Sequence, residues 1–281
     1  MTTGAFLGID GGGSTTVARL EDGPGAEVFE RATGSTNPHT TPFPQVQARF
    51  DELLAGCPPP DAAAICLAGM SRAATRDRVG SWFRDRFPTA VLRLEPDYAA
   101  ALRCFDPEPA ICVIAGTGSV VCSRAAGGAL VTSGGTGYGS DPGSASRLGR
   151  ALVDRYADDP GAVDDLGPAI DAVLGAHKEG EGVAAAAPVL CGAADAGHGW
   201  ALTLVADEMD ELAALAVTHS ERHCRDADLT VGLVGGVWSS AATRATFARS
   251  LRARLGAPVT FVPAVHTPQR AAVLLAREAA P

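Results

Sequence analysis

Two glycine-rich turns contain the residues of this sequence that could hold a phosphorylated ligand. They are Asp10–Thr16 (DGGGSTT) and Gly116–Ser119 (GTGS). Glycine lets backbone N–H groups approach a ligand oxygen closely, and the serine and threonine hydroxyls add hydrogen-bond donors. Asp10 supplies a carboxylate where a Mg²⁺ ion bound to phosphates would sit. These turns therefore predict phosphate binding through backbone amides, hydroxyls and a metal ion.

The lysine content excludes the common lysine-dependent phosphate binders. Lys178 is the sole lysine and lies in AHKEG, which is neither a Walker P-loop nor the strand motif of a protein kinase. AHKEG also gives no support to the Schiff-base lysine of a pyridoxal enzyme. A nucleotide would therefore have to be held without lysine.

Strands are expected on both sides of each glycine turn, because the flanking residues are apolar and β-branched. The expected strands are 5–10, 16–20 and 26–31 around the first turn, and 110–115, 120–124 and 129–132 around the second. Alternating elements follow each set: helices at 42–55, 74–87, from 97, 144–156, 165–175, 198–224 and from 267, and strands at 63–68, 91–94, 229–234 and 259–262.

The same order of elements thus occurs twice, which predicts an α/β fold of two similar lobes with a ligand cleft between them. We place the N-terminal lobe at 1–110, completed by a C-terminal helix at 267–281, and the second lobe at 111–266. Each glycine turn alone could serve only a tight hairpin. Their matched positions in the two halves favour the phosphate-binding interpretation.

A third glycine motif, Gly235–Val237, follows an apolar strand and opens a helix. Small residues there would let a flat group such as adenosine lie against the backbone. Two glycines are common at strand–helix junctions, so this signal is weak by itself. It also differs from the GxGxxG motif of dinucleotide-binding folds.

Together these motifs resemble those of a known superfamily. DGGGSTT, AGTGS and VGLVGGV are similar to the phosphate-1, phosphate-2 and adenosine motifs of the sugar kinase–actin–chaperone ATPases. More narrowly, the chain resembles the N-acetylglucosamine kinase-like family (BadF/BadG/BcrA/BcrD-type ATPases). Four further segments carry this resemblance, in the family's order: Gly34–Asn37, Leu67–Gly69, Pro96–Leu102 and Gly134–Ser144. It implies two ribonuclease H-like (actin-like ATPase) lobes with a central nucleotide and sugar cleft.

The resemblance implies an ATP-dependent kinase that phosphorylates O6 of an amino sugar, N-acetylglucosamine or glucosamine, with Mg²⁺. The implied phosphate ligands are Gly11, Gly12, Gly13, Ser14, Thr15, Thr16, Gly116, Thr117, Gly118 and Ser119. Asp10 would order Mg²⁺ through water, and Gly235, Gly236 and Val237 would contact adenosine. The implied sugar ligands are Asn37, Gly69, Asp97, Gly135 and Asp141.

Asp97 has the implied role of general base, which accepts the proton of the sugar hydroxyl. Its position alone would equally suit a helix N-cap, and the two roles are compatible. The sequence departs from the family at three positions. Pro96 stands where the family often has Asn, Thr136 where it usually has Trp, and Pro142 where it usually has Glu or Gln. The last two lie in the sugar-side loop, so glucosamine, N-acetylglucosamine, a muramic-type sugar and another hexose all remain open as acceptors.

Charge and cysteine content bear on the protein's binding partners and cellular compartment. With 23 Lys+Arg and 32 Asp+Glu the formal net charge is −9, which argues against nucleic acid or an anionic membrane as a partner. The seven cysteines include no CxxC pair, and no signal peptide or membrane span is recognisable. We expect a cytoplasmic protein with a small-molecule sugar substrate. Family members are often dimers, and a homodimer is compatible with the sequence.

Two other functions are weighed against the kinase. An ATPase activase of an iron–sulfur dehydratase or reductase would need cysteines in glycine-rich loops, for which Cys191 in LCGAA is the sole candidate. A non-catalytic sugar sensor would need a DNA-binding segment, for which the sequence before Asp10 leaves no room.

His219 and His223 have a spacing that could bind a metal, but without an HExxH motif we assign them to a solvated helix face. The cysteine cluster of the related ROK kinases has no counterpart, so we expect no structural zinc. Trp238 is a candidate for the adenine pocket.

Overall fold

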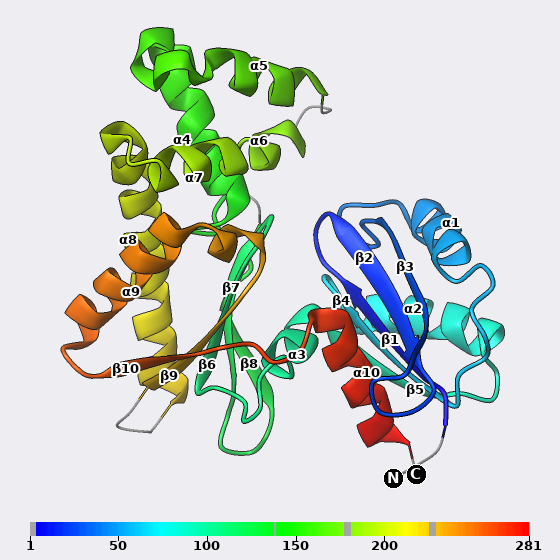
Figure 1. Cartoon of the computed structure of the whole chain (residues 1–281). Coiled ribbons are helices and arrows are strands. Elements are labelled where there is room, and N and C mark those ends of the chain that lie inside the picture. Colours follow the sequence, from blue (N-terminus) through cyan, green and yellow to red (C-terminus); the bar gives the residue numbers. More distant parts are fainter. Residues whose placement is uncertain (1–3, 138, 177–180, 225–228, 281) are drawn as a thin grey trace. The chain divides into compact units, whose positions relative to one another are not determined.

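A computed structural model describes residues 4–137, 139–176, 181–224 and 229–280. Tyr138 of the sugar-side loop and Lys178 lie outside the described residues. The chain forms two compact units (Figure 1). Unit 1 consists of Met1–Glu108 together with Ala264–Pro281, and unit 2 consists of Pro109–Pro263. The C-terminal segment therefore packs with the N-terminal half.

Unit 1 is built on a five-stranded mixed sheet in the order β3-β2-β1-β4-β5. Its strands are β1 (Phe6–Gly11), β2 (Thr15–Glu21), β3 (Glu27–Gly34), β4 (Ala62–Leu67) and β5 (Val91–Pro96). The β1, β2 and β3 strands form an antiparallel meander, whereas β4 and β5 run parallel to β1. Every residue of β4 is buried, as its uninterrupted apolar sequence AAAICL leads one to expect. The helices of this unit are α1 (Phe43–Leu53), α2 (Ala73–Arg86), α3 (Asp97–Leu102) and α10 (Pro268–Ala279).

The C-terminal helix α10 lies directly on β1, and Gly8 makes this approach possible. A Cβ atom at Gly8 would be 2.3 Å from the backbone nitrogen of Val273 and 2.5 Å from the carbonyl oxygen of Gln269. Any larger residue would force the helix away from the strand. Because Asp10 lies two residues further along β1, its side chain leaves the sheet on the same face as α10.

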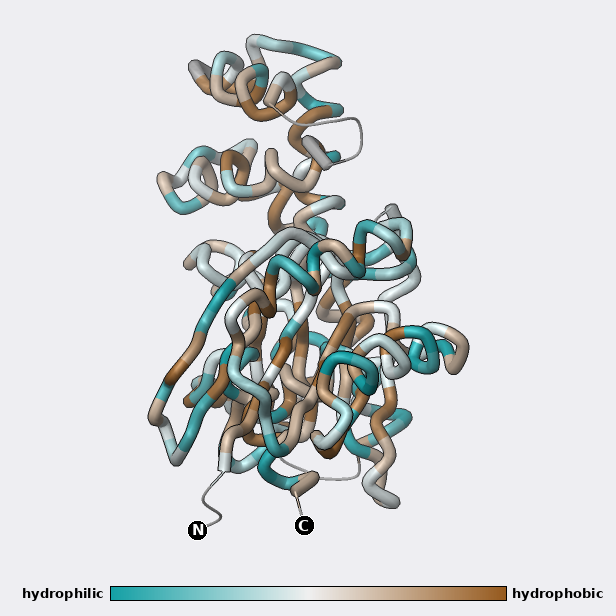
Figure 2. Tube along the Cα trace, turned by 90° about the vertical axis from the view of Figure 1, so that its right-hand side faces the viewer, coloured by the Kyte–Doolittle hydropathy of each residue, from teal (hydrophilic) through white to brown (hydrophobic). Residues whose placement is uncertain are grey.

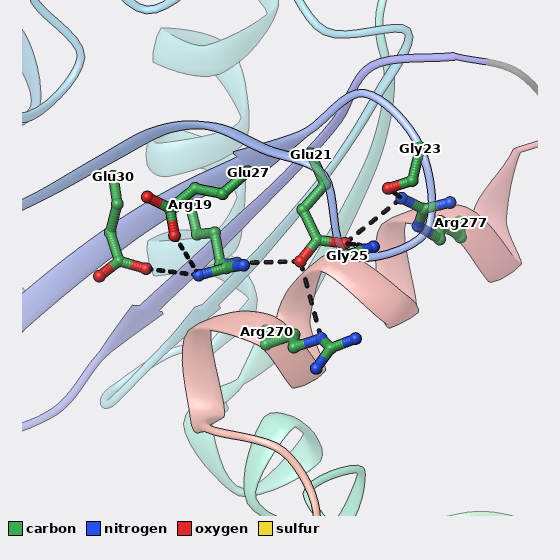
Figure 3. Close-up of polar contacts among 8 residues, drawn as sticks. All are labelled: Arg19, Glu21, Gly23, Gly25, Glu27, Glu30, Arg270 and Arg277. Carbon is green, nitrogen blue, oxygen red and sulfur yellow. Dashed lines mark hydrogen bonds and ion pairs between the residues drawn. The ribbon is translucent and has the colours of Figure 1, made fainter.

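A buried carboxylate fastens α10 to the meander (Figure 3). Glu21, at the end of β2, is 1% exposed and accepts a hydrogen bond from Arg19 Nε at 2.9 Å. From α10, Arg277 Nη2 lies 3.3 Å from Glu21 Oε2, and Arg270 Nε lies 3.7 Å from Glu21 Oε1. One carboxylate thus faces three guanidinium groups, two of them from the C-terminal helix.

Unit 2 repeats the same sheet plan in the order β10-β9-β6-β7-β8. Its strands are β6 (Ile111–Ala115), β7 (Ser119–Arg124), β8 (Leu130–Gly134), β9 (Leu229–Val234) and β10 (Val259–Val262). Here too the first three strands form an antiparallel meander, and the last two run parallel to the first. The predicted α/β fold and the repeated strand order are confirmed.

The helices of unit 2 are α4 (Ala145–Asp158), η1 (Pro160–Leu166), α5 (Gly167–Ala176), α6 (Glu181–Ala185), α7 (Ala187–Asp195), α8 (Gly199–His223), η2 (Gly236–Ser239) and α9 (Ala241–Leu255). Apolar and polar residues alternate along these helices (Figure 2), and the buried ones recur at helical spacing, such as Leu148 and Leu152. The sequence analysis missed α6 and α7. Their apolar, alanine-rich sequence has no clear polar face, and α7 is largely buried in the core of the unit.

The assignment of His219 to a solvated face of α8 is wrong. His219 is 0% exposed, and its ring nitrogens lie 2.9 Å from Ser123 Oγ on β7 and 2.9 Å from Ser133 Oγ on β8. Burial, and secondarily the charge of His223, lowers the pKa of His219 to about 4. His219 is therefore a neutral core residue at neutral pH.

No single helix within the described ranges is long and apolar enough to cross a membrane. The segments Val183–Asp195 and Gly199–His223, bent by 119°, meet the length and composition criteria only when taken together.

Candidate active site

The phosphate-1 turn is a hairpin between β1 and β2. Gly11 pairs with Thr16, and the turn is closed by a hydrogen bond from Gly12 N to Thr15 O at 3.0 Å. Packing within the protein explains glycine at position 11, because a Cβ there would be 2.5 Å from Leu67 Cδ2. No atom lies within 4 Å of a Cβ built on Gly12, and its backbone does not require glycine. The open space beside Gly12 suits a ligand that lies against the backbone.

The phosphate-2 turn shows the same contrast. Gly116 N donates to Gly118 O at 2.9 Å, which closes a hairpin between β6 and β7. A Cβ at Gly118 would be 2.8 Å from Asp141 Oδ2, so packing accounts for that glycine. A Cβ at Gly116 would meet nothing within 4 Å. Each predicted phosphate turn therefore contains one glycine that the protein's own packing does not explain.

The adenosine motif lies beside the phosphate-2 turn. Gly235 has φ +115°, and a Cβ there would be 2.3 Å from Ala115 O, at the end of the strand that leads into Gly116. Gly236, by contrast, faces open space. The neighbouring Trp238 is 6% exposed and donates from Nε1 to Val113 O at 3.0 Å, so it packs in the core of unit 2.

Two carboxylates come together in unit 1. Asp10 lies in β1, and Asp97 is the first residue of α3, directly after β5. Burial, and secondarily the negative charge of Asp97, raises the pKa of Asp10 to about 8. Burial also raises the pKa of Asp97 to about 6, although its hydrogen bonds from the backbone of Tyr98 and of Asp97 itself oppose this. Low pH would leave both groups protonated.

Neither carboxylate forms an ion pair with a residue in the described part of the chain. Two nearby acidic groups without a cation raise each other's pKa, and a divalent cation would relieve the repulsion. Carboxylate oxygen is also the donor that Mg²⁺ prefers. The residues present therefore fit a magnesium ion at Asp10.

Asp97 is not the N-cap residue of α3. Pro96 occupies that position, and the Asp97 side chain accepts from Tyr98 N at 3.1 Å through Oδ1. This bond holds the carboxylate at the helix start while leaving Oδ2 for another partner. The N-cap interpretation of Asp97 is therefore wrong, while its hydrogen bond from Tyr98 N is compatible with the proton-acceptor role.

The predicted sugar residues Asn37 and Gly69 are in contact. Gly69 has φ +85°, and a Cβ there would lie 2.7 Å from Asn37 Oδ1. Asn37 is itself 9% exposed and accepts from His39 N at 3.0 Å. This part of unit 1 thus brings together two residues that are 32 positions apart in the sequence.

Two residues that the sequence analysis did not select connect this loop to the phosphate-1 hairpin. Thr36 Oγ1 lies 2.9 Å from Thr16 Oγ1, and Thr36 N donates to the same atom at 3.1 Å. Ser35 Oγ donates to Gly12 O at 3.3 Å. The position of these residues within the segment Gly34–Asn37, which carries part of the family resemblance, was the one available signal. A hydrogen bond between a strand residue and a loop residue 20 positions away leaves no motif in the sequence.

In unit 2, the predicted sugar residues Gly135 and Asp141 lie against the phosphate-2 turn. Gly135 has φ +69°, and its N–H donates to Ser119 O at 2.9 Å. Asp141 is 3% exposed, and Ser119 N lies 3.4 Å from its Oδ2 atom. Ser146, which the sequence analysis also did not select, donates from Oγ to Thr117 O at 2.7 Å. The turn therefore rests on the start of α4.

Comparison with known families decides where this arrangement belongs. Residues 7–276 match the family model described as the BadF/BadG/BcrA/BcrD ATPase family. The chain belongs to the BadF/BadG/BcrA/BcrD ATPase family. No curated protein matches the chain.

Solved structures with the same fold include sugar kinases. A candidate N-acetylglucosamine kinase from Chromobacterium violaceum is 25% identical with a TM-score of 0.70, over 96% of this chain and 98% of that one. A second, from Porphyromonas gingivalis, is 18% identical with a TM-score of 0.74, over 96% and 97%. A ROK family glucokinase from Streptomyces griseus, in complex with glucose and AMPPNP, is 18% identical with a TM-score of 0.67, over 98% and 99%.

A more distant match is the activator of a 2-hydroxyisocaproyl-CoA dehydratase from Clostridium difficile, at 13% identity and a TM-score of 0.51 over 98% of this chain and 95% of that one. The family and its structural relatives together make this chain an ATPase with the sugar kinase-like, actin-like fold.

Proposed function

We propose that this BadF/BadG/BcrA/BcrD-family ATPase is a kinase that transfers a phosphoryl group from ATP to O6 of an amino sugar, N-acetylglucosamine or glucosamine. The observation that carries the proposal is the pair of half-buried carboxylates, Asp10 and Asp97, next to a phosphate-1 turn with open space at Gly12. Phosphoryl transfer requires such a metal ligand, a proton acceptor and a phosphate cradle.

The two carboxylates would divide the work between them. Asp10 would hold the water shell of Mg²⁺ at the end of β1. When bound, Mg²⁺ would neutralise charge on the phosphates of ATP. Asp97 would accept the proton of the sugar hydroxyl, for which a pKa near 6 leaves it ionised at neutral pH. Its hydrogen bond from Tyr98 N would keep the carboxylate in place during the transfer.

The glycine turns would bind the phosphates through backbone N–H groups and the hydroxyls of Ser14, Thr15 and Thr117. The hydroxyls of Thr16 and Ser119, which the resemblance also implied as phosphate ligands, are buried and hydrogen-bonded to Thr36 and Pro142 instead. Adenosine would lie against Gly236, where no side chain occupies the adjoining space. Asn37, Gly69 and Gly135 would bind the sugar. We further propose a cytoplasmic location, where ATP and phosphorylated sugars are retained.

A coupled assay of ADP release tests the proposal. Purified protein would be incubated with ATP and Mg²⁺ and each of a series of amino sugars and neutral hexoses. We expect the highest kcat/KM for N-acetylglucosamine or glucosamine, and a 6-phosphate as the product by NMR. A flat response across all sugars would contradict the kinase activity and favour a non-catalytic sugar sensor of the same fold.

An iron–sulfur activase is the second candidate, supported only by the fold of the more distant relative. Its sole candidate cluster ligand, Cys191, lies within helix α7 and is 9% exposed, not in a glycine-rich loop. Burial raises the pKa of this thiol to about 11, which disfavours the thiolate that an iron–sulfur cluster needs. A brown, oxygen-sensitive protein preparation that contains iron would support the activase function instead of the kinase function.

A further inference from the structure

We propose that Asp141 is a positioning residue that joins the sugar-side loop to the phosphate-2 turn, and that nucleotide binding depends on this junction even when no sugar is present. The proposal deepens the kinase function and rests on it. It replaces the sugar contact expected for Asp141 from sequence. The sugar-side loop is here residues 134–144, and the phosphate-2 turn is Gly116–Ser119.

Both oxygens of the Asp141 carboxylate accept hydrogen bonds from the protein. Its Oδ1 atom accepts from Thr136 N at 2.7 Å, from Thr136 Oγ1 at 3.2 Å and from Gly137 N at 3.2 Å. Its Oδ2 atom accepts from Ser119 N at 3.4 Å. Each oxygen of an ionised carboxylate has about two lone pairs, so the three donors to Oδ1 leave none there for a sugar hydroxyl, whereas Oδ2 keeps one acceptor position. With 3% exposure, the residue also offers little surface for a ligand.

These four donors come from two different segments. Thr136 and Gly137 belong to the sugar-side loop, whereas Ser119 ends the phosphate-2 turn. The two oxygens of one side chain therefore hold the two segments at a fixed spacing. Gly118 fits this arrangement, because a Cβ there would lie 2.8 Å from Asp141 Oδ2 and would displace the carboxylate.

Other hydrogen bonds make the junction a continuous structure. Ser119 Oγ donates to Pro142 O at 2.6 Å, and Gly135 N donates to Ser119 O at 2.9 Å. On the far side of the loop, Gly143 N donates to Glu208 Oε2 at 2.9 Å, which anchors the loop to α8. The loop and the turn therefore adopt their conformations together. A change in the loop must alter the backbone amides that would cradle a phosphate.

The junction is compatible with Pro142, where the sequence departs from the Glu or Gln usual in the family. The backbone carbonyl of Pro142 is the group that Ser119 Oγ contacts, and any residue type can supply it. Proline fixes φ and so limits the conformations of the loop beside Asp141. This position thus contributes to the junction through its backbone.

Asp141→Asn is the variant that separates the two roles. The amide retains one acceptor oxygen and replaces the other with an NH₂ group, which would face either Ser119 N or the pair of Thr136 and Gly137 amides. Donor would then oppose donor on one side of the junction. Isothermal titration calorimetry with Mg²⁺ and AMPPNP, without sugar, should show nucleotide binding at least about 10-fold weaker than wild type.

The matched control is Asp210→Asn, an exposed carboxylate of α8 in the same unit that pairs with Arg254. It should bind nucleotide like the wild type. If Asp141→Asn binds nucleotide normally and only its KM for the sugar rises, Asp141 is a sugar ligand and the junction role is wrong. If the wild type itself binds no nucleotide, the proposed kinase function is wrong, and the junction role falls with it.

Hydrogen exchange on the wild-type protein gives a second test that does not depend on a variant folding. Binding of Mg²⁺ and AMPPNP without sugar should slow exchange at the amides of Thr136 and Gly137 at least several-fold. Unchanged exchange at these two amides would overturn the proposal. Protection that appears only after addition of N-acetylglucosamine would do the same.

Discussion

The charge of Asp97, at the start of α3, raises the pKa of Asp10, which lies in β1. The two carboxylates are thus coupled, although 87 positions separate them in the sequence. Burial is the larger cause of the rise, and it leaves the pair without a positive partner in the described structure. A site of this kind is poorly solvated and repulsive until a cation binds.

Asp97→Asn should abolish phosphoryl transfer, by at least about 1,000-fold in kcat, while nucleotide affinity remains near wild type and the Tm is not lowered. The amide keeps the hydrogen bond from Tyr98 N through its oxygen but cannot accept a proton. Initial rates of ADP release with saturating sugar measure the effect. Turnover near the wild-type value would show that Asp97 is not the base.

The pH dependence of kcat/KM provides an independent check on the base. Asp97 must be ionised to accept a proton, and burial raises its pKa to about 6. The rate should therefore fall as the pH decreases through about 6, and an unperturbed aspartate would instead place this fall near 4. An acidic limb near pH 4 would contradict the environment described for Asp97.

Asp10→Asn should stabilise the ligand-free protein, and more so at pH 8 than at pH 5. The unfolded chain loses the Asp10 proton near pH 3.8, whereas the folded protein keeps it to about pH 8. The folded state therefore binds more protons across this window, and its stability falls as the pH rises. The measurement is the difference in Tm between variant and wild type at both pH values, without Mg²⁺ or nucleotide. A difference independent of pH would show that the pKa of Asp10 is not raised.

Matched glycine substitutions distinguish a ligand cradle from a packing requirement. Gly12→Ala and Gly116→Ala meet no atom within 4 Å, so both variants should retain the wild-type Tm but bind Mg²⁺ and AMPPNP at least about 10-fold more weakly. The controls, Gly11→Ala and Gly118→Ala, place a methyl group 2.5 Å from Leu67 Cδ2 and 2.8 Å from Asp141 Oδ2, and should lower the Tm. If Gly12→Ala and Gly116→Ala bind nucleotide as tightly as the wild type, the two turns do not bind its phosphates.

Glu21→Gln should destabilise unit 1 by about 3–5 kcal/mol, because it leaves three buried or half-buried arginines without their shared carboxylate. Glu27→Gln is the control, since Glu27 pairs with the same Arg19 but has a side chain that is 46% exposed. That change should cost less than about 1 kcal/mol. Chemical denaturation measures both, and equal losses would show that the cluster in Figure 3 does not fasten α10.

Local sequence patterns were enough to predict two similar sets of strands and the turns that join the first two strands of each set. The order of strands and helices along the chain followed from local patterns: apolar runs, glycine turns and the repetition of both. The order of strands within each sheet came from the structure. Residues of the phosphate-1 turn are close in sequence, so a hairpin brings them together without any distant contact. For the same reason the phosphate-2 turn and the adenosine motif could be assigned to their elements from sequence.

The folded structure was needed to show which glycines are required for packing within the protein and which face open space where a ligand could lie. Gly11 and Gly12 are adjacent glycines of the same turn, and nothing in the sequence distinguishes them. A Cβ at Gly11 would clash with Leu67, whereas a Cβ at Gly12 would face open space. From its sequence, His219 is expected on the exposed face of a helix. In the structure it is buried and hydrogen-bonded to serines of two neighbouring strands. The four donors around Asp141 also come from separate segments. Such contacts join side chains that are far apart in the sequence and meet only in the folded protein. The spacing of residues along the chain therefore does not predict them.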